Sequence, residues 1–284
     1  MSNIKNKIII GTAQFCKKYG IFKKKSKKSD VLSILKYLKK NKIYTLDTAF
    51  NYNILKLSKK YNFKLQKFKI ITKIPKLTSP KSEKKTLRIL KNDLKIFQLK
   101  RYQCIYLHDT INLNKTDLIR SIKFLKLLKS TKITNNIGFS LYNTSDYIKL
   151  RKYLKPDQVQ IPFNFFDQEF LNKKFLKLFK FDNTKIHARS IFLQGVIVNN
   201  NIKNKKMKLI INKIKNICKI EDIKPIDACI NFVLNKKKID KVVVGIDNVN
   251  ELKEVLNFKK KNLNFNFLNR ISLNKKYIKP YLWK

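Results

Sequence analysis

The chain alternates short runs of β-branched and other apolar residues with longer segments in which apolar residues recur every three or four positions. Short apolar runs bounded by polar residues predict strands, whereas the longer periodic segments predict helices. Strands that alternate with helices are typical of a parallel sheet joined by crossover helices. The eight predicted strands are Lys7–Ile10, Ile43–Asp47, Lys69–Lys73, Gln103–Leu107, Lys132–Gly138, Asp157–Ile161, Lys185–Ser190 and Lys241–Gly245.

Amphipathic helices are predicted between these strands. Ser29 and Asp30 are candidate caps for the first of them. Pro225 suits the first turn of a helix that runs to about Leu234. The apolar positions that predict the remaining helices are Val31, Leu35 and Leu38; Leu87, Leu90, Leu94 and Phe97; Leu118, Ile122 and Leu125; Tyr147 and Leu150; Met207, Ile210, Ile214 and Ile217; and Val249, Leu252 and Leu256.

Eight strand–helix units within 284 residues predict a single-domain α/β protein with the architecture of a (β/α)8 TIM barrel. A doubly wound open sheet is the alternative, but it usually has fewer strands and an early GxGxxG motif, which is absent here. No linker rich in Pro, Gly or Ser divides the chain. The tail, residues 262–284, is expected to pack on the barrel; Tyr277, Tyr281 and Trp283 could line a pocket there, although packing is the preferred interpretation.

Hydrophobic residues make up 43% of the chain, which is enough for a large core and argues against intrinsic disorder. No apolar stretch approaches the roughly 18 residues that a membrane span needs. The basic start, Met1–Lys7, is followed by only three apolar residues, too few for a secretory signal. The cysteines lie far apart without a CxxC pair, which predicts reduced thiols in a cytoplasmic compartment. They are Cys16, Cys104, Cys218 and Cys229.

The formal net charge of +48 raises the question of nucleic-acid binding. Of the 66 basic residues, however, 60 are Lys and only six are Arg, and the lysines are spread along the whole chain. Lys, Asn, Ile and Phe share A/T-rich codons, so an A/T-rich genome would produce this composition whatever the protein does. We therefore predict a solvated lysine surface without specific nucleic-acid binding. Weak, salt-sensitive attraction to polyanions would still follow from the charge.

Polar side chains follow three successive predicted strands. Asp47 ends the second strand and Tyr52 follows it, Lys73 ends the third, and His108 follows the fourth. In a barrel the carboxyl ends of the strands form one rim, so these four side chains can converge. Each has a structural explanation when taken singly; their joint placement is what indicates a site.

These four residue types together suit the reduction of a carbonyl group. A free phenol titrates near 10, and a buried ammonium beside it would lower the phenol pKa. A carboxylate paired with the ammonium keeps it charged, and an imidazole can hydrogen-bond the substrate oxygen. The result is a proton donor aimed at a carbonyl oxygen. The accompanying hydride must come from a nicotinamide or a flavin.

Over essentially its whole length the chain resembles the aldo-keto reductase superfamily. The resemblance rests on the opening Gly11–Phe15 with Tyr19–Ile21, on Asp47–Ala49 with Tyr52, on Ile71–Lys73 and on Leu107–Asp109. It is similar in its start to a subgroup described as oxidoreductases. The resemblance implies a (β/α)8 barrel without metal that reduces aldehydes or ketones with NADPH, less often NADH. It implies Tyr52 as general acid, Lys73 and Asp47 as the pair that tunes it, and His108 as the residue that orients the substrate.

The same resemblance implies a set of cofactor-binding residues. Ser140 and Gln160 would hydrogen-bond the nicotinamide carboxamide. The segment from Arg189 to Gly195 would follow the ring and the pyrophosphate, and the turn after Val244 would hold the adenosine phosphate at a helix N-terminus. The full set is Thr12, Ser140, Gln160, Arg189, Ser190, Gly245, Asp247, Asn248 and Glu251.

At four positions the chain departs from the family pattern, which affects the roles that the resemblance implies for these residues. Asn53 follows Tyr52 where Gly is usual, which predicts an altered loop, and Leu141 follows Ser140 where Asn is common. Arg189 stands where an aromatic ring often stacks on the nicotinamide. Asp247 would repel a 2′-phosphate and so favours NAD(H), whereas the surrounding lysines favour NADP(H), and the sequence leaves both open.

The sequence therefore predicts an NAD(P)H-dependent reductase of a small carbonyl compound. The alternative keeps the barrel and the nucleotide but not turnover, as a regulatory or redox-sensing subunit. A polyanion-binding protein is a third hypothesis that rests on charge alone. The substrate and the oligomeric state cannot be read from the sequence.

Overall fold

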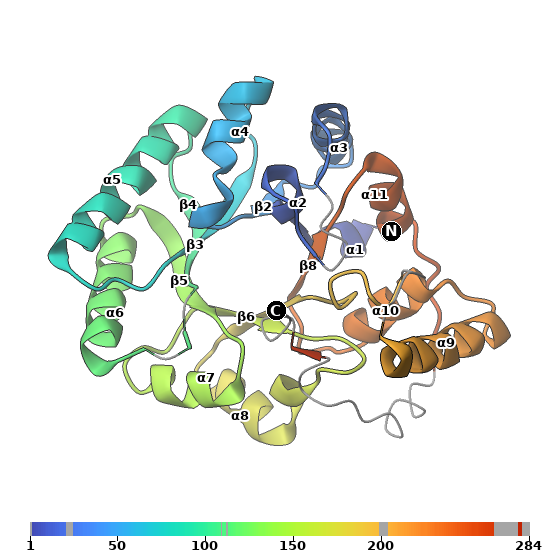
Figure 1. Ribbon diagram of the computed structural model, residues 1–284. Helices are drawn as coiled ribbons and strands as arrows, with labels where there is room; N and C mark the ends of the chain where they lie inside the picture. Colours follow the sequence, from blue (N-terminus) through green and yellow to red (C-terminus); the bar gives the residue numbers. More distant parts are fainter. Residues whose placement is uncertain are drawn as a thin grey trace.

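The computed structural model describes residues 2–20, 25–108, 110–111, 113–198, 204–263 and 278–279. Eight parallel strands form a closed barrel in chain order, as Figure 1 shows. Pairing of Ile8 with Val242 joins the first strand to the last and closes the barrel. The strands are β1 (Ile8–Gly11), β2 (Thr45–Asp47), β3 (Lys69–Ile74), β4 (Tyr102–Leu107), β5 (Thr134–Ser140), β6 (Gln158–Pro162), β7 (Lys185–Arg189) and β8 (Lys241–Gly245).

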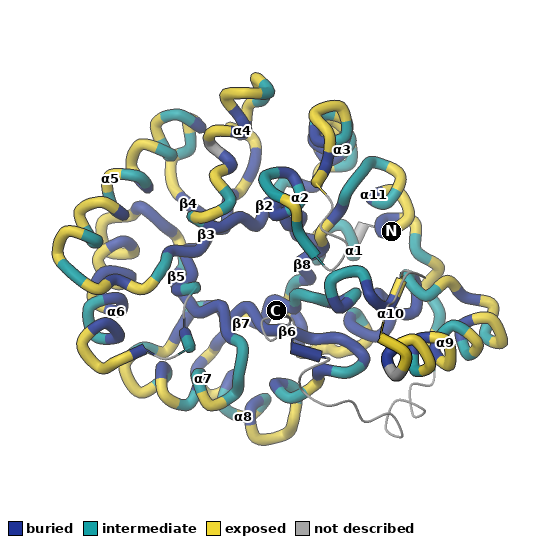
Figure 2. The backbone as a smooth tube through the Cα atoms, viewed as in Figure 1, coloured by how far each residue is buried: buried dark blue, intermediate teal, exposed yellow. Residues whose placement is uncertain are grey.

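The barrel prediction is confirmed, and the open-sheet alternative is wrong. Every observed strand lies within two residues of its predicted bounds, because a parallel barrel strand is buried on both faces and reads as a continuous apolar run. The strands form the buried inner ring and the helices present their exposed faces outward (Figure 2).

All helices predicted from apolar periodicity are present. The longer helices are α3 (Lys28–Lys40), α4 (Ile54–Tyr61), α5 (Pro80–Phe97), α6 (Lys115–Ser130), α7 (Thr144–Arg151), α8 (Lys173–Phe181), α9 (Lys205–Ile220), α10 (Pro225–Leu234) and α11 (Val249–Leu256). The shorter ones are α1 (Ser2–Lys5), α2 (Ala13–Cys16), η1 (Phe50–Tyr52) and η2 (Glu169–Leu171). Sequence reasoning missed α4 and α8. Both are short, and α8 buries only Phe175 and Phe179.

The predicted caps of the first long helix are wrong. Helix α3 begins at Lys28, with Lys27 at the N-cap position, so Ser29 and Asp30 lie inside its first turn. Asp30 still serves this helix end, because its carboxylate accepts a hydrogen bond from the backbone N–H of Lys27 at 3.3 Å.

A small cluster of buried side chains is separate from the main core and comes from strands β1, β3, β4 and β8: Ile9, Ile71, Cys104, Tyr106 and Val243. The hydroxyl of Tyr106 also lies 3.0 Å from Nδ1 of His187 and 3.2 Å from Oε1 of Gln158. Strands β5 and β6 also pack closely. A Cβ at Gly138 of β5 would lie 1.9 Å from the backbone oxygen of Gln158 in β6, so glycine is required there.

Most of the predicted C-terminal tail, including Tyr277, Tyr281 and Trp283, lies outside the described residues. Two described tail residues, Ile278 and Lys279, are buried. The Lys279 ammonium lies 3.0 Å from Asp167 and 3.4 Å from Glu169. Within the described ranges, no helix is long and apolar enough to span a bilayer.

Candidate active site

A cavity of about 750 Å³ opens where the strands end, and the strand ends and the loops that follow them line it. All four predicted catalytic residues line it, as do seven of the nine predicted cofactor residues. The barrel therefore brings together side chains that are up to about 200 residues apart in the chain. The predicted site residues that line the cavity are Asp47, Tyr52, Lys73, His108, Ser140, Gln160, Arg189, Ser190, Gly245, Asp247 and Glu251.

An ion pair lies at the base of the cavity. Nζ of Lys73 on β3 is 2.5 Å from Oδ2 of Asp47 on β2, and it also donates to the backbone oxygen of Thr48 at 3.0 Å. The other Asp47 oxygen accepts from Nε2 of Gln160 at 2.8 Å. Both charged residues are almost fully buried, at 4% and 3% exposure. Burial lowers the pKa of Lys73, and the Asp47 carboxylate opposes that shift.

Tyr52 ends the short helix η1, which follows β2 and carries the phenol to the cavity. Asn53, which comes next, has φ 55° and ψ 45°, the left-handed conformation that glycine adopts readily and that asparagine tolerates better than most residues. The side chain of Asn53 also accepts from the N–H of Lys56 and caps α4. Asn53 therefore has the left-handed backbone conformation that glycine, the usual residue of the family at this position, adopts most readily.

The pKa of the Tyr52 phenol depends on its surroundings in the cavity. Burial raises its pKa well above the usual value, with nearby Tyr19 and Asp47 adding to the rise and Arg189 opposing it. The predicted pairing of Lys73 with Asp47 is present, and the Lys73 ammonium also donates to Thr48; that this ammonium tunes Tyr52 stays a prediction. At neutral pH Tyr52 therefore carries its proton.

His108 follows β4, and its backbone N–H donates to the oxygen of Ile74 at 2.9 Å. Burial lowers its pKa to about 3, and the positive charges of Lys73, Arg189 and Lys17 act in the same direction. The imidazole is therefore neutral at physiological pH, and a neutral imidazole can donate one hydrogen bond. Asp109, the next residue, lies outside the described part of the chain.

Two buried polar groups face the cavity from β5 and β6. The Ser140 hydroxyl is buried and has no hydrogen-bond partner among the described residues. Gln160 uses its Nε2 group on Asp47, which leaves its amide oxygen as an acceptor. A donor–acceptor pair of this kind matches the needs of a carboxamide. Leu141 is fully buried, and its backbone oxygen accepts from Arg189.

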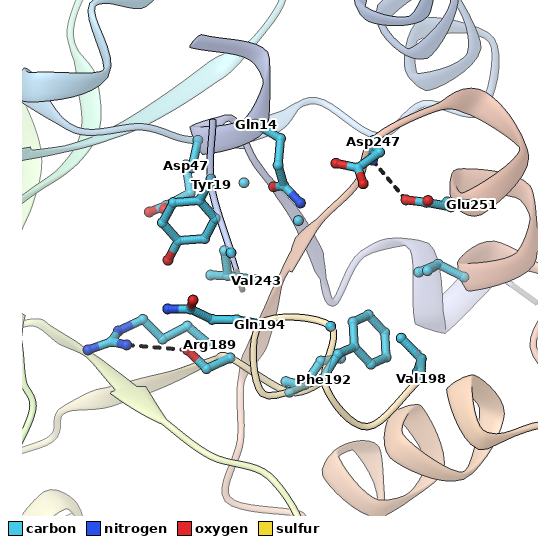
Figure 3. Close-up of a pocket in the computed structure, with 18 of the residues that line it drawn as sticks. Gln14, Tyr19, Asp47, Arg189, Phe192, Gln194, Val198, Val243, Asp247 and Glu251 are labelled. Carbon is cyan, nitrogen blue, oxygen red and sulfur yellow. Dashed lines mark hydrogen bonds between the residues drawn. The ribbon is translucent and has the colours of Figure 1, made fainter. Parts of the chain in front are cut away.

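Arg189 ends β7 and is held in place by neutral groups. Its Nη2 donates to the oxygen of Leu141 at 2.9 Å, and its Nη1 lies 3.4 Å from the Ser190 hydroxyl. The guanidinium lies 4.7 Å from the centre of the Tyr142 ring. In Figure 3, Arg189, Tyr19 and Asp47 lie on one side of the cavity.

The opposite side of the cavity is acidic. Asp247, Glu251 and Glu254 line it, and Figure 3 shows the first two across the cavity from Arg189. The N–H of Asp247 donates to Glu251 at 2.8 Å. Lys224 also lines this end, 3.7 Å from Glu254.

Two predicted cofactor residues do not line the cavity. The Thr12 hydroxyl is fully buried and donates to the backbone oxygen of Asp47 at 3.0 Å, so it supports the end of β2. Asn248 is the N-cap of α11, where its side chain accepts from the N–H groups of Asn250 and Glu251. Both roles are structural in this arrangement.

Sequence reasoning assigned no role to several residues that line the cavity. Lys17, which follows α2, lies with its ammonium 4.6 Å from the centre of the Tyr52 ring. Tyr142 and Glu254 also line the cavity. Lys17 carried no signal in the sequence, because it is one of 60 lysines. No group of three or more His, Cys, Asp or Glu side chains that could hold a metal occurs in the described residues.

Comparison with known proteins identifies the family. The family model for the aldo/keto reductase family matches residues 7–273, whereas no curated protein matches the chain. A glycerol dehydrogenase from Gluconobacter oxydans is similar in structure with a TM-score of 0.70 at 13% identity, covering 93% of this chain and 89% of that one. The holo form of an aldo-keto reductase from Bacillus halodurans gives a TM-score of 0.67 at 14% identity, covering 93% and 91%. The family match over nearly the whole chain, together with the closed barrel and its rim cavity, shows that the chain belongs to the aldo/keto reductase family.

Proposed function

We propose that the protein reduces a small aldehyde or ketone with a nicotinamide cofactor and that Tyr52 is the general acid. One observation carries the proposal: a phenol, a buried ammonium–carboxylate pair and a neutral imidazole line a single cavity at the carboxyl ends of the strands. Family membership supports the coarser conclusion that the chain is an oxidoreductase.

The residues in the cavity fit a nicotinamide. Ser140 has a buried hydroxyl without a partner, and Gln160 has an amide oxygen available, so both can bind a carboxamide. When bound, the reduced nicotinamide would supply the hydride that no protein side chain can provide. Ser190 would contact the cofactor where β7 ends.

Residues of this chain would supply the proton and orient the carbonyl oxygen that receives it. Tyr52 holds its proton at neutral pH and would donate it to the carbonyl oxygen as the negative charge develops there. His108, which is neutral, would donate a hydrogen bond to the same oxygen and orient it. The Lys73 ammonium, held by Asp47, would favour the phenolate that Tyr52 leaves behind.

NAD(H) is the cofactor that the acidic end of the cavity favours. The family resemblance implies that the adenosine part extends toward Asp247, and the structure adds Glu251 and Glu254 beside it. Three carboxylates would repel a dianionic 2′-phosphate, whereas a ribose hydroxyl can donate to a carboxylate. Lys224 is the cation that favours NADP(H), but it lies close to Glu254, which offsets its charge.

The test is to measure NADH and NADPH oxidation with a panel of aldehydes and ketones, using the wild-type protein and Tyr52→Phe. We expect turnover with a higher kcat/KM for NADH, and a loss of at least about 100-fold in the variant. Unchanged turnover in Tyr52→Phe would exclude it as the acid. Tight nucleotide binding without turnover on any carbonyl compound would favour the regulatory alternative instead.

A further inference from the structure

The catalytic side of the cavity holds two cations without acidic partners. Lys17 lies over the ring of Tyr52, and within the described part of the chain its ammonium has no carboxylate within 4.0 Å. Arg189 likewise has only neutral partners there, namely the Leu141 carbonyl, the Ser190 hydroxyl and the Tyr142 ring. Both side chains line the same cavity as Tyr52. Among the described residues, therefore, no carboxylate pairs with either charge next to Tyr52.

The neighbouring carboxylates are already engaged. Asp47 is bound by Lys73 and Gln160, and Asp167 is bound by Lys279. The acidic residues that line the cavity elsewhere lie at its opposite end (Figure 3). Outside the described residues the chain has a single acidic side chain, that of Asp109.

The two cations also differ from the surface lysines in how they are held. Two hydrogen bonds and the Tyr142 ring fix Arg189, so its planar guanidinium group is already positioned to bind an anion. Lys17 is half-buried, and its ammonium is held on the face of Tyr52. Their fields reach the catalytic residues, because both lower the pKa of His108.

We propose that the substrate is an anionic carbonyl compound whose carboxylate or phosphate group is bound by Lys17 and Arg189. This inference rests on the proposed reductase function and adds the class of substrate to it. A neutral carbonyl compound would gain nothing from the two cations. An anionic group would neutralise them, and charge-assisted hydrogen bonds to it would place the carbonyl group near Tyr52.

Matched substrate pairs test the proposal: succinic semialdehyde against butanal for a carboxylate, and glyceraldehyde 3-phosphate against glyceraldehyde for a phosphate. We expect kcat/KM at least about tenfold higher for the anionic member of one pair, and a decrease in this preference as salt is added. The pair that shows the preference identifies the anionic group. Equal kcat/KM within both pairs would overturn the proposal.

Lys17→Gln tests the residue, with the ratio of anionic to neutral kcat/KM as the readout. We expect this ratio to fall about tenfold. If Lys17 only supported the Tyr52 ring, both substrates would be affected equally and the ratio would stay constant, which would refute its assignment. Lys155→Gln is the matched control. Lys155 also stacks on an aromatic ring, 4.8 Å from the centre of Phe181, but it precedes β6 at the opposite end of the barrel.

A binding measurement separates this inference from the reductase proposal. Succinate should raise the Tm of the wild-type protein more than succinamide does, and Lys17→Gln should remove that difference. If succinate binds in this way but no aldehyde is reduced, the anion site stands and the reductase proposal fails. If aldehydes are reduced but succinate and succinamide act alike, the anion site fails and the reductase proposal stands.

Discussion

The buried Asp47–Lys73 pair makes a quantitative prediction about stability. The two charges lie 2.5 Å apart at 4% and 3% exposure. Asp47→Asn removes the negative charge and leaves the ammonium buried with only the Thr48 carbonyl and neutral groups around it. Loss of one partner of such a pair costs about 3–5 kcal/mol of unfolding free energy. For a chain of this size that corresponds to a decrease in Tm of about 5–8 °C.

A double-mutant cycle tests whether the cost comes from the unpaired charge. Lys73→Met should also destabilise the protein, because it leaves the Asp47 carboxylate buried. The double variant, which buries neither charge, should be more stable than Asp47→Asn alone. Denaturant unfolding of the four proteins gives the free energies. Additive effects, or a loss below about 0.5 kcal/mol in Asp47→Asn, would refute the argument.

The sign of the pH dependence gives a further check on the same variant. Burial already lowers the pKa of Lys73, and Asp47 is the main group that raises it. Without Asp47 the pKa of Lys73 in the folded state falls further below its value in the unfolded state. At a pH between these two pKa values the unfolded state therefore binds one more proton than the folded state. The stability of Asp47→Asn should therefore rise with pH from that lowered pKa toward about 10.4. A deficit relative to the wild type that stays constant between pH 7 and 9 would contradict this.

Two further predictions concern the barrel itself. Gly138→Ala should cost more than about 4 kcal/mol or prevent folding, because its Cβ would lie 1.9 Å from the backbone oxygen of Gln158. Gly11→Ala is the control: its nearest contacts would be at 3.5 Å, so a stability loss as large as that of Gly138→Ala would contradict the reasoning. His187 is buried with its pKa lowered to about 3, so the unfolded state takes up a proton below its own pKa of 6.5 while the native state does not. Stability should fall between pH 6.5 and 3, and His187→Asn should reduce the slope of unfolding free energy against pH by up to about 1.4 kcal/mol per unit. A slope that is the same in both proteins would refute the assignment.

The strands, and the meeting of the predicted catalytic residues at one rim, were predictable from sequence for one physical reason. Barrel strands are buried on both faces, so they read as apolar runs, and the ends of those runs mark the rim. Asp47, Lys73 and His108 could therefore be placed at one mouth without any coordinates. All three line the observed cavity.

Contacts made by loops were not predictable in the same way. The pairing of Lys73 with Asp47 was predicted, but the hydrogen bond from Lys73 to the Thr48 carbonyl was not. Lys17 reaches the Tyr52 ring only because the turn after α2 carries it there, and no pattern separates it from the other lysines. Its position depends on tertiary packing rather than on any periodic signal.

The scarcity of acidic residues makes their positions informative. The chain has 66 basic residues but only 18 acidic ones, so codon bias can explain a lysine almost anywhere but cannot explain a carboxylate. Three carboxylates nevertheless line one end of the cavity, and at the opposite end two cations have no carboxylate partner among the described residues. Such a division of charge would suit the two molecules proposed above, an anionic group of the substrate near Tyr52 and the ribose hydroxyls of the cofactor near Asp247. A net charge of +48 spread evenly would favour a basic cavity throughout, so the acidic end is the feature that the proposed cofactor accounts for and the composition does not.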